Sequence, residues 1–269
     1  MSMENNLWQH ILRVRNTSPL VHNITNYVVM NNTANSLLAI GASPIMAHAQ
    51  SEVEDMVNIS HSLVINIGTL DEYWEDAMLL AAKKANELQK PWVLDPVGAG
   101  ATPYRDKAIS SLLSLNPTVI RGNASEIIAI AKANKTVTKG VDSTAMSSEA
   151  VEAAKSLTEI HNSVICISGE TDIVISKDQI ICLKNGHPMM TKVTGLGCTA
   201  SAIIGAFLGV TENKTEAVVS AMSLLSIAGE LAAEKSTGPG SLQVNIIDKL
   251  YNMTQDEFST HLKLSDHAS

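Results

Sequence analysis

Aromatic residues make up only 3% of this 269-residue chain, and its 19 Lys and Arg are outnumbered by 27 Asp and Glu. A chain without a global basic field or an aromatic platform lacks the features by which proteins usually hold nucleic acid. We therefore expect no nucleic-acid partner. The net charge of -8 still permits a phosphate-bearing ligand, provided that local donors and a cation neutralise its charge.

Cysteine is also scarce. Cys166, Cys182 and Cys198 do not make a disulfide framework, and neither a C-x-x-C pair nor a close group of His and Cys suggests zinc. The first 16 residues are polar and lack the apolar centre of a signal peptide. The apolar stretch at 200–210 is too short to span a bilayer. These absences predict a cytoplasmic protein with no membrane partner.

What the chain does have is a recurring order of elements: a short apolar run, then Gly, Asn or Asp, then a helical stretch. Strands are expected at 43–46, 63–67, 92–94, 118–120 and 164–168, followed by a hairpin of 173–176 with 179–183. Helices are expected at 27–40, 71–89, 148–160, 199–208, 215–234 and 243–251, and from 125 onward. This alternation predicts right-handed crossovers and one α/β domain, with a mostly parallel sheet flanked by helices.

In sheets of this kind, ligands bind beyond the carboxyl ends of the strands. The residues expected at those ends are Gly68, Asp95, Arg121, Asn123 and Gly169. Because two of these positions are charged, the edge favours a polar, phosphate-bearing ligand.

The segment V-T-G-L-G-C-T-A at 193–200 is the most informative one. A strand-like run precedes it and a helix of small residues follows, so Gly195 and Gly197 would let the backbone approach a ligand. Free amides and the positive dipole at the helix start would complete an anion hole for a transferring phosphoryl group. A plain turn before a helix is the alternative. Cys198 is either a small buried apolar residue or a thiol whose pKa the helix start lowers.

Two phosphate-binding motifs are excluded. Gly195, Gly197 and Ala200 match the dinucleotide pattern G-x-G-x-x-A, but the acidic residue about 20 positions on, Glu216, lies in a helical pattern instead of ending a strand. The pattern G-x-x-x-x-G-K-[ST] is absent. Phosphate binding here would therefore follow another design.

Acidic and basic side chains occur at successive strand ends. Asp95 precedes a glycine-rich loop, Arg121 ends the next strand, and Glu126 lies at a helix start. Two carboxylates that face phosphates suit magnesium, and arginine suits bidentate phosphate contact. Separately, Asp95 fits a turn before proline and Glu126 fits a helix dipole. Together they favour a magnesium and phosphate site.

Near the N-terminus, Thr25 or Asn26 is expected to cap the helix that starts at about residue 27, with His22 and Asn23 just before it. S-E-V-E at 51–54 predicts a capping box. Met46 would present either an apolar wall to a ligand or core filler.

In order along the chain, several segments resemble hydroxyethylthiazole kinases of the thiamine salvage pathway, a ribokinase-like family. The matching segments are 19–26, 41–46, 66–69, 94–103, 121–123, 168–170, 192–198 and 238–241. The resemblance covers nearly the whole chain. It implies a single ribokinase-like domain over 1–269, ATP as donor, and the alcohol of 4-methyl-5-(2-hydroxyethyl)thiazole as acceptor. It also implies a homotrimer whose sites lie between neighbouring subunits.

The resemblance further implies roles for single residues. It assigns Arg121, Ser168 and Gly197 to ATP, and Asp95 and Glu126 to magnesium and the phosphates. It assigns the thiazole site to Met46, Gly195, Gly68, Asn23 and Thr25.

Cys198 stands where most ribokinase-like enzymes carry a catalytic aspartate, and the resemblance implies a cysteine base. Leu196 and Ser168 depart from the family pattern, in which Ala or Thr and Thr respectively are usual. Two alternatives stay open: a sibling kinase for hydroxymethylpyrimidine, and a nucleotide-dependent dehydratase or silent nucleotide binder on the same fold.

Overall fold

The computed structural model describes residues 3–133 and 143–266. Its strands are β1 (Leu20–Ile24), β2 (Ser43–Ile45), β3 (Ser62–Asn66), β4 (Trp92–Asp95), β5 (Val119–Asn123), β6 (Val164–Ser168), β7 (Asp172–Ile175), β8 (Ile180–Leu183) and β9 (Leu264–Asp266). Its α-helices are α1 (Met3–Thr17), α2 (Met30–Ala39), α3 (Val53–Ile59), α4 (Glu72–Glu87), α5 (Pro103–Leu113), α6 (Ala124–Ala133), α7 (Ser143–His161), α8 (Leu196–Leu208), α9 (Lys214–Ala233), α10 (Pro239–Asn252) and α11 (Gln255–His261), with a 3₁₀ helix, η1, at Pro188–Lys192.

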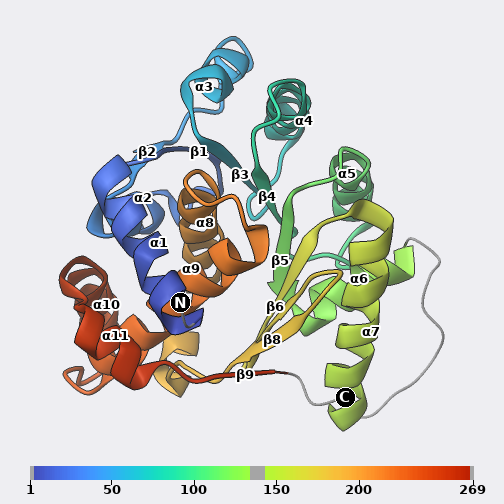
Figure 1. Cartoon of the computed structure of the whole chain (residues 1–269). Coiled ribbons are helices and arrows are strands. Elements are labelled where there is room, and N and C mark those ends of the chain that lie inside the picture. The colour runs from blue at the N-terminus through green and yellow to red at the C-terminus, as the bar shows by residue number, and fades with distance from the viewer. Residues whose placement is uncertain (1–2, 134–142, 267–269) are drawn as a thin grey trace.

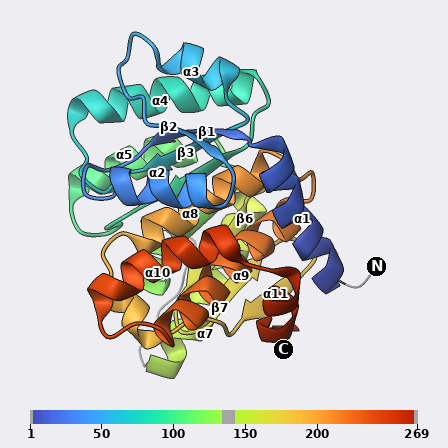
Figure 2. The same cartoon turned by 90° about the vertical axis from the view of Figure 1, so that its left-hand side faces the viewer.

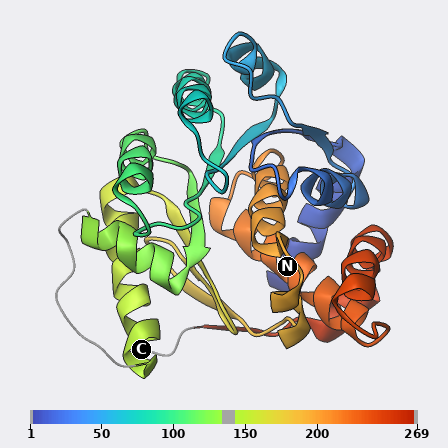
Figure 3. The ribbon, with the colours of Figure 1, turned by 180° about the vertical axis from the view of Figure 1, so that it is seen from behind.

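The strands form one sheet in the order β2-β1-β3-β4-β5-β6-β7-β8-β9 (Figure 1). Neighbouring strands from β2 to β6 run parallel, whereas β7, β8 and β9 continue the sheet in antiparallel pairs. Helices cover both faces, as the views from the front and from behind show (Figures 1 and 3). The predicted α/β fold with a mostly parallel sheet and flanking helices is confirmed.

Side chains of each parallel strand alternate between two cores. Val64 and Val93 pack with α8 and α9 on one face, whereas Leu63, Ile65 and Leu94 pack with α4 and its neighbours on the other. Successive strand residues point to opposite faces of a sheet, so a strand covered on both sides must be apolar throughout. This is why the short apolar runs predicted the central strands correctly.

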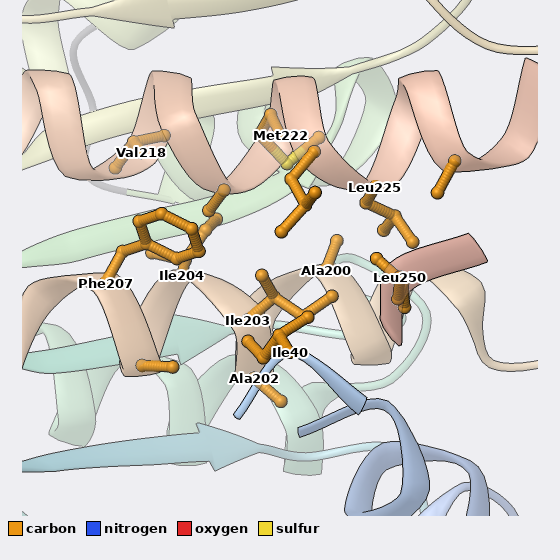
Figure 4. Packing of buried hydrophobic residues seen from close by; sticks show 14 of the residues in the cluster. Ile40, Ala200, Ala202, Ile203, Ile204, Phe207, Val218, Met222, Leu225 and Leu250 are labelled. Carbon is orange, nitrogen blue, oxygen red and sulfur yellow. The ribbon is translucent and has the colours of Figure 1, made fainter. Parts of the chain in front are cut away.

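Helices α8 and α9 form the centre of one core (Figure 4). Ala200, Ile203, Ile204 and Phe207 of α8 are buried, as is Met222 of α9. On the outer side of α9 lies α10 (Figure 2). Helix α9 is long and apolar enough to cross a membrane, yet 83% of that stretch is buried inside the protein, as expected of a core helix. Helix α8 in turn packs against β3 and β4 of the sheet.

The N-terminal region differs from the sequence-based expectation. Residues 20–24 form β1, and the helix expected from residue 27 begins only at Met30. Neither Thr25 nor Asn26 caps it, because its N-cap position is Val29 and no side chain bonds there. Polar His22 and Asn23 concealed the strand, although both are buried within the sheet.

Other helix ends gave mixed results. Gly41 follows the end of α2 in the left-handed conformation, with φ +92°, as is common after helix ends. The capping box expected at 51–54 is wrong, because α3 begins after Glu52 without a side-chain cap. Helices α1 and α5 and the edge strand β9 were not expected from the sequence.

Candidate active site

The carboxyl ends of the parallel strands gather the polar residues that the topology predicted. Asn66 ends β3 and pairs in register with Asp95, which ends β4. One step across the sheet, Arg121 lies within β5 and pairs with Cys166, while Asn123 at the end of β5 pairs with Ser168. The three most important groups of the site, an amide, a carboxylate and a guanidinium, therefore come from neighbouring strands.

The glycine loop turns from η1 into α8, so the strand-like run expected before it is wrong. Gly195 adopts φ +85° and forms the N-cap of α8. A Cβ on Gly195 would lie 2.5 Å from Cγ1 of Val29, and one on Gly197 would lie 2.7 Å from Nη1 of Arg121. Position 195 therefore requires glycine, because of its left-handed backbone and the close approach of Val29, whereas glycine at position 197 lets the guanidinium approach the loop.

Arg121 lies between this loop and the carboxylate of Asp95. Its Nη1 is 4.0 Å from Oδ2 of Asp95, and its side chain is 12% exposed. Its Nε is buried without a hydrogen-bond partner among the described residues. A guanidinium with unused donors beside free amides at a helix start can bind phosphate oxygens.

Asp95 is buried at the bottom of the site and belongs to a polar network. Its Oδ2 accepts hydrogen bonds from Nδ2 of Asn66 (2.7 Å) and from Oγ of Ser201 (2.7 Å). Burial raises the pKa of this carboxyl, while the charge of Arg121 and the two hydrogen bonds favour its ionised form.

The network continues from Asn66 toward the acceptor side. Oδ1 of Asn66 accepts from Nδ2 of Asn26 (2.8 Å) and from the backbone N–H of Gly68 (3.0 Å). Nδ2 of Asn26 also donates to Sγ of Cys198 (3.5 Å). Side chains from β3, β4, α8 and the segment after β1 thus meet around the cysteine.

Cys198 lies in the first turn of α8, as expected, but the predicted lowering of its thiol pKa is wrong. Burial raises the pKa of the Cys198 thiol, and the nearby charge of Asp95 raises it further. Hydrogen bonds from Asn66 and Asn26 and the charge of Arg121 act in the opposite direction without reversing the shift. The position of Cys198 at a helix start therefore does not by itself predict the pKa of its thiol.

Glu126 lies near the carboxyl ends of β4 and β5, where its carboxylate connects the segments that follow these strands. Its Oε1 accepts from the N–H of Gly98 (2.9 Å), and its Oε2 accepts from the N–H of Asn123 (2.9 Å). The described residues contain no group of three or more His, Cys, Asp or Glu placed to hold a metal. A Mg²⁺ ion does not need three such side chains, because it is commonly bound by one or two carboxylates together with phosphates and water. Asp95 and Glu126 fit that requirement.

A cavity of about 570 Å³ opens next to Arg121. Its lining includes Arg121, Ser168 and Gly197, the acidic Glu170 and Asp172, and the apolar Leu196, Met222 and Leu225. This brings together the three residues that the sequence assigned to ATP. A pocket lined by a guanidinium and by several apolar side chains suits a nucleotide, whose phosphates are charged and whose base is apolar.

Apart from Gly195 of the glycine loop, the residues assigned to the thiazole lie within or just after β1, β2 and β3. Gly68 touches the network, since a Cβ there would lie 2.5 Å from Nδ2 of Asn26. Met46 follows β2 and is half-buried. Thr25 is buried, and Asn23 donates to the carbonyl of Val21 (2.9 Å) from within the sheet. The structure therefore gives Asn23 a backbone partner of its own.

Sequence reasoning missed three contributors to the site: Asn66, Ser201 and Arg105. Asn66 carried a signal, because it directly ends an apolar strand. Arg105 of α5 donates from Nη1 to the carbonyl of Ile67 (2.6 Å) and from Nη2 to that of Gly68 (2.6 Å). Nη1 also donates to the carbonyl of Val97 (2.9 Å), so one guanidinium holds the loops after β3 and β4 together.

Comparison with known proteins yields a consistent result. Residues 11–256 match the profile described as "Hydroxyethylthiazole kinase family". The chain is 54% identical to a hydroxyethylthiazole kinase of Syntrophus aciditrophicus over 260 residues, which cover 96% of both chains. It is also 54% identical to one of Leptospira biflexa over 264 residues, covering 94% of this chain and 98% of the relative.

Solved structures agree. The structure of a hydroxyethylthiazole kinase protein from Pyrococcus horikoshii OT3 superposes with a TM-score of 0.91 at 40% identity, covering 98% of this chain and 100% of the other. A pyridoxal kinase from Staphylococcus aureus, solved with pyridoxal, superposes with a TM-score of 0.67 at 16% identity, covering 92% and 97%. The second likeness concerns the fold alone.

Proposed function

Because this chain belongs to the hydroxyethylthiazole kinase family, we propose that it transfers the γ-phosphoryl group of ATP to the hydroxyl of 4-methyl-5-(2-hydroxyethyl)thiazole. In this reaction the hydroxyl oxygen forms a bond to the γ-phosphorus, the bond to the β-phosphate oxygen breaks, and ADP leaves. The observation that carries the proposal is Arg121, packed against Gly197 at the start of α8 and facing the nucleotide-sized cavity.

The protein's own contribution is mainly positioning and charge stabilisation, as in other phosphoryl transfers. Free amides at the start of α8 and the Arg121 guanidinium would hold the phosphate oxygens and stabilise the charge that develops on them. Ser168 and the apolar wall that includes Met222 would hold the rest of the nucleotide. The acceptor would approach from the side of Gly68, Asn26 and Met46.

Asp95 and Glu126 would hold magnesium, directly or through water. When bound, Mg²⁺ would neutralise phosphate charge. A Glu126→Gln variant keeps the shape of the side chain but cannot accept from both Gly98 and Asn123. We expect it to need several-fold more Mg²⁺ for half-maximal activity, and an unchanged magnesium requirement would remove Glu126 from this role.

The hydroxyl proton needs an acceptor, and Cys198 is the candidate. Because burial and Asp95 raise the pKa of its thiol, only a small thiolate fraction would be present at neutral pH. The base would therefore contribute modestly, and most of the rate enhancement would come from positioning.

We also propose that the protein works as a homotrimer with sites between subunits. Tyr27 and Val28 directly follow Asn26 in the chain and are 60% and 66% exposed, although both are large and apolar. Apolar side chains exposed beside an acceptor site suggest that another chain covers them. Light scattering should give the mass of three 28.7 kDa chains, and Val28→Asp should lower it together with thiazole affinity. A monomer with full activity would refute this assembly.

The reaction is tested by a coupled ADP-release assay with ATP, Mg²⁺ and hydroxyethylthiazole, with hydroxymethylpyrimidine as the comparison acceptor. ADP release with the thiazole alone would support the proposal. Release with the pyrimidine alone would favour the sibling kinase, and nucleotide binding without any phosphorylated product would favour a dehydratase or silent binder. The cytoplasmic location and the absence of nucleic-acid and membrane partners stay predictions.

A further inference from the structure

The side chain of Asn66, which the sequence analysis did not assign to the site, forms hydrogen bonds to three other residues of the site. It is 1% exposed. Its Nδ2 donates to Asp95 Oδ2 (2.7 Å), and its Oδ1 accepts from Asn26 Nδ2 (2.8 Å) and from Gly68 N–H (3.0 Å). Both ends of the carboxamide are therefore engaged at once.

These contacts fix which way the amide points. The carboxylate of Asp95 can only accept when ionised, so it requires the NH₂ end of Asn66. The N–H of Gly68 can only donate, so it requires the oxygen end. A flipped amide would place oxygen against oxygen and N–H against N–H. The Asp95 carboxylate is buried and the Gly68 contact is partly buried, so the unpaired polar atoms would be costly. Only a side chain with one donor end and one acceptor end satisfies both neighbours.

Asn66 also connects the two halves of the site. Asp95 lies on the phosphate side beside Arg121, whereas Asn26 lies on the acceptor side, where it donates to Cys198 Sγ (3.5 Å). Because Asn66 bonds to both, a displacement of its amide would move the carboxylate and the partner of the thiol together. The hydrogen bond from Asn66 also favours the thiolate of Cys198, lowering the thiol pKa against the larger effect of burial.

We propose that Asn66 is a positioning residue for phosphoryl transfer, which holds Asp95 and the Asn26–Cys198 pair in register across the site. The kinetic part of this inference rests on the proposed function. The residue is not expected to touch ATP, because it does not line the nucleotide cavity. Its loss should therefore lower kcat and leave the KM for ATP nearly unchanged.

The test variant is Asn66→Asp, which keeps the size of the side chain and replaces its NH₂ end by a carboxyl group that has to share a proton with Asp95. A misplacement of reacting groups by about 1 Å can cost on the order of 100-fold in rate. We expect kcat to fall about 100-fold, with the KM for ATP within threefold of the wild type. The matched control is Asn252→Asp, the same chemical change at an exposed residue near the end of α10, which should leave both parameters unchanged.

A second readout does not depend on the substrate. Iodoacetamide should alkylate Cys198 in preference to Cys166 and Cys182, which are buried, and peptide mass mapping distinguishes the three. Asn66→Asp removes the amide donor to the thiol, so we expect alkylation about tenfold slower, equivalent to one pKa unit. A purely structural role would loosen the strand end, expose the thiol and make alkylation faster.

The outcomes are distinct. A wild-type enzyme that releases no ADP would refute the proposed function, while the alkylation rates would still test Asn66. A kcat for Asn66→Asp within threefold of the wild type, or faster alkylation of Cys198, would overturn the positioning role. If Asn66→Asp does not fold, Asn26→Ala tests the same bridge from its other end, and an unchanged kcat there would also overturn it.

Discussion

The guanidinium of Arg121 lies with Nη1 4.0 Å from Oδ2 of Asp95, and both of its Nη atoms approach Gly197 at the start of α8. The ion pair is close enough to orient the arginine but too long to use its hydrogen-bond donors. The side chain is therefore held in place with donors free for phosphate oxygens.

Replacing Arg121 with alanine should chiefly weaken ATP binding. A charged hydrogen bond contributes about 1.5–3 kcal/mol, so we expect nucleotide affinity to fall roughly ten- to 100-fold, measured by calorimetry with ATP. Arg121→Lys should recover part of the loss, because lysine keeps the positive charge but lacks the planar set of donors that lets a guanidinium make paired hydrogen bonds to phosphate. Arg13→Ala, at an exposed position of α1, is the control. Unaltered affinity in Arg121→Ala would remove this residue from the phosphate site.

Cys198→Ala should slow turnover more than it weakens ATP binding, because the thiol faces the network around Asn26 instead of the nucleotide cavity. We expect kcat to fall by about tenfold to 100-fold, at the low end of what a general base contributes. ATP affinity should stay within twofold. Turnover equal to that of the wild type would show that the cysteine is not a needed base.

The pH profile gives a separate test of the same thiol. Because burial and Asp95 raise the pKa of Cys198 above its ordinary value, the thiolate fraction increases only in the alkaline range. If thiolate is the base, the kcat of the wild type should rise with pH above neutrality, and Cys198→Ser should flatten that rise. A profile with the same slope in both proteins would assign the rise to another group.

The fold could be read from the sequence where burial leaves an unmistakable pattern. Strands β3, β4 and β6 are covered on both faces, so they appear as apolar runs that end at Asn, Asp or Ser. Strand β1 was missed because His22 and Asn23 interrupt its pattern. Tertiary contacts compensate that polarity: Nε2 of His22 bonds to the carbonyl of Ala47 at 2.8 Å.

The site could be predicted only as far as topology places residues. The rule that ligands bind at the carboxyl ends of strands identified Asp95 and Arg121. The contact between Asn26 and Asn66 joins positions 40 residues apart, and no spacing in the sequence indicates it. The pKa of Cys198 was wrongly predicted for the same reason, because the helix start is local whereas burial and the charge of Asp95 are not.

Arg105 should matter for stability as well as for the site. Its guanidinium bonds to the carbonyls of Ile67, Gly68 and Val97. Lysine cannot reach all three with one ammonium group, so Arg105→Lys should lower the free energy of unfolding by about 2–3 kcal/mol, measured in urea. The KM for the thiazole should rise as the Gly68 loop loosens. Arg13→Lys is the control, and equal stability of the two variants would contradict the role of Arg105 as a clamp.

Acid stability depends in part on Glu257 at the start of α11. Its carboxylate accepts from Nζ of Lys249 (2.8 Å) and from the N–H of Thr254 (3.0 Å), and these bonds lower its pKa from the usual 4.5 to about 2. Because the folded state prefers the ionised form, this stabilisation is complete above pH 4.5 and disappears as the pH falls from 4.5 toward 2.

The matching experiment compares urea unfolding of the wild type and Glu257→Gln between pH 7 and pH 3. The side chain is 34% exposed, so solvent screening limits the expected difference at pH 7 to about 1 kcal/mol. That difference should shrink steadily below pH 4.5, because Glu257 of the unfolded wild-type chain then takes up a proton while the folded carboxylate, whose pKa is about 2, stays ionised. Glu152→Gln, which breaks the exposed pair with Lys155, should change stability little at any pH. A gap between wild type and Glu257→Gln that stays constant down to pH 3 would mean that the cap acts by its shape and not by its charge.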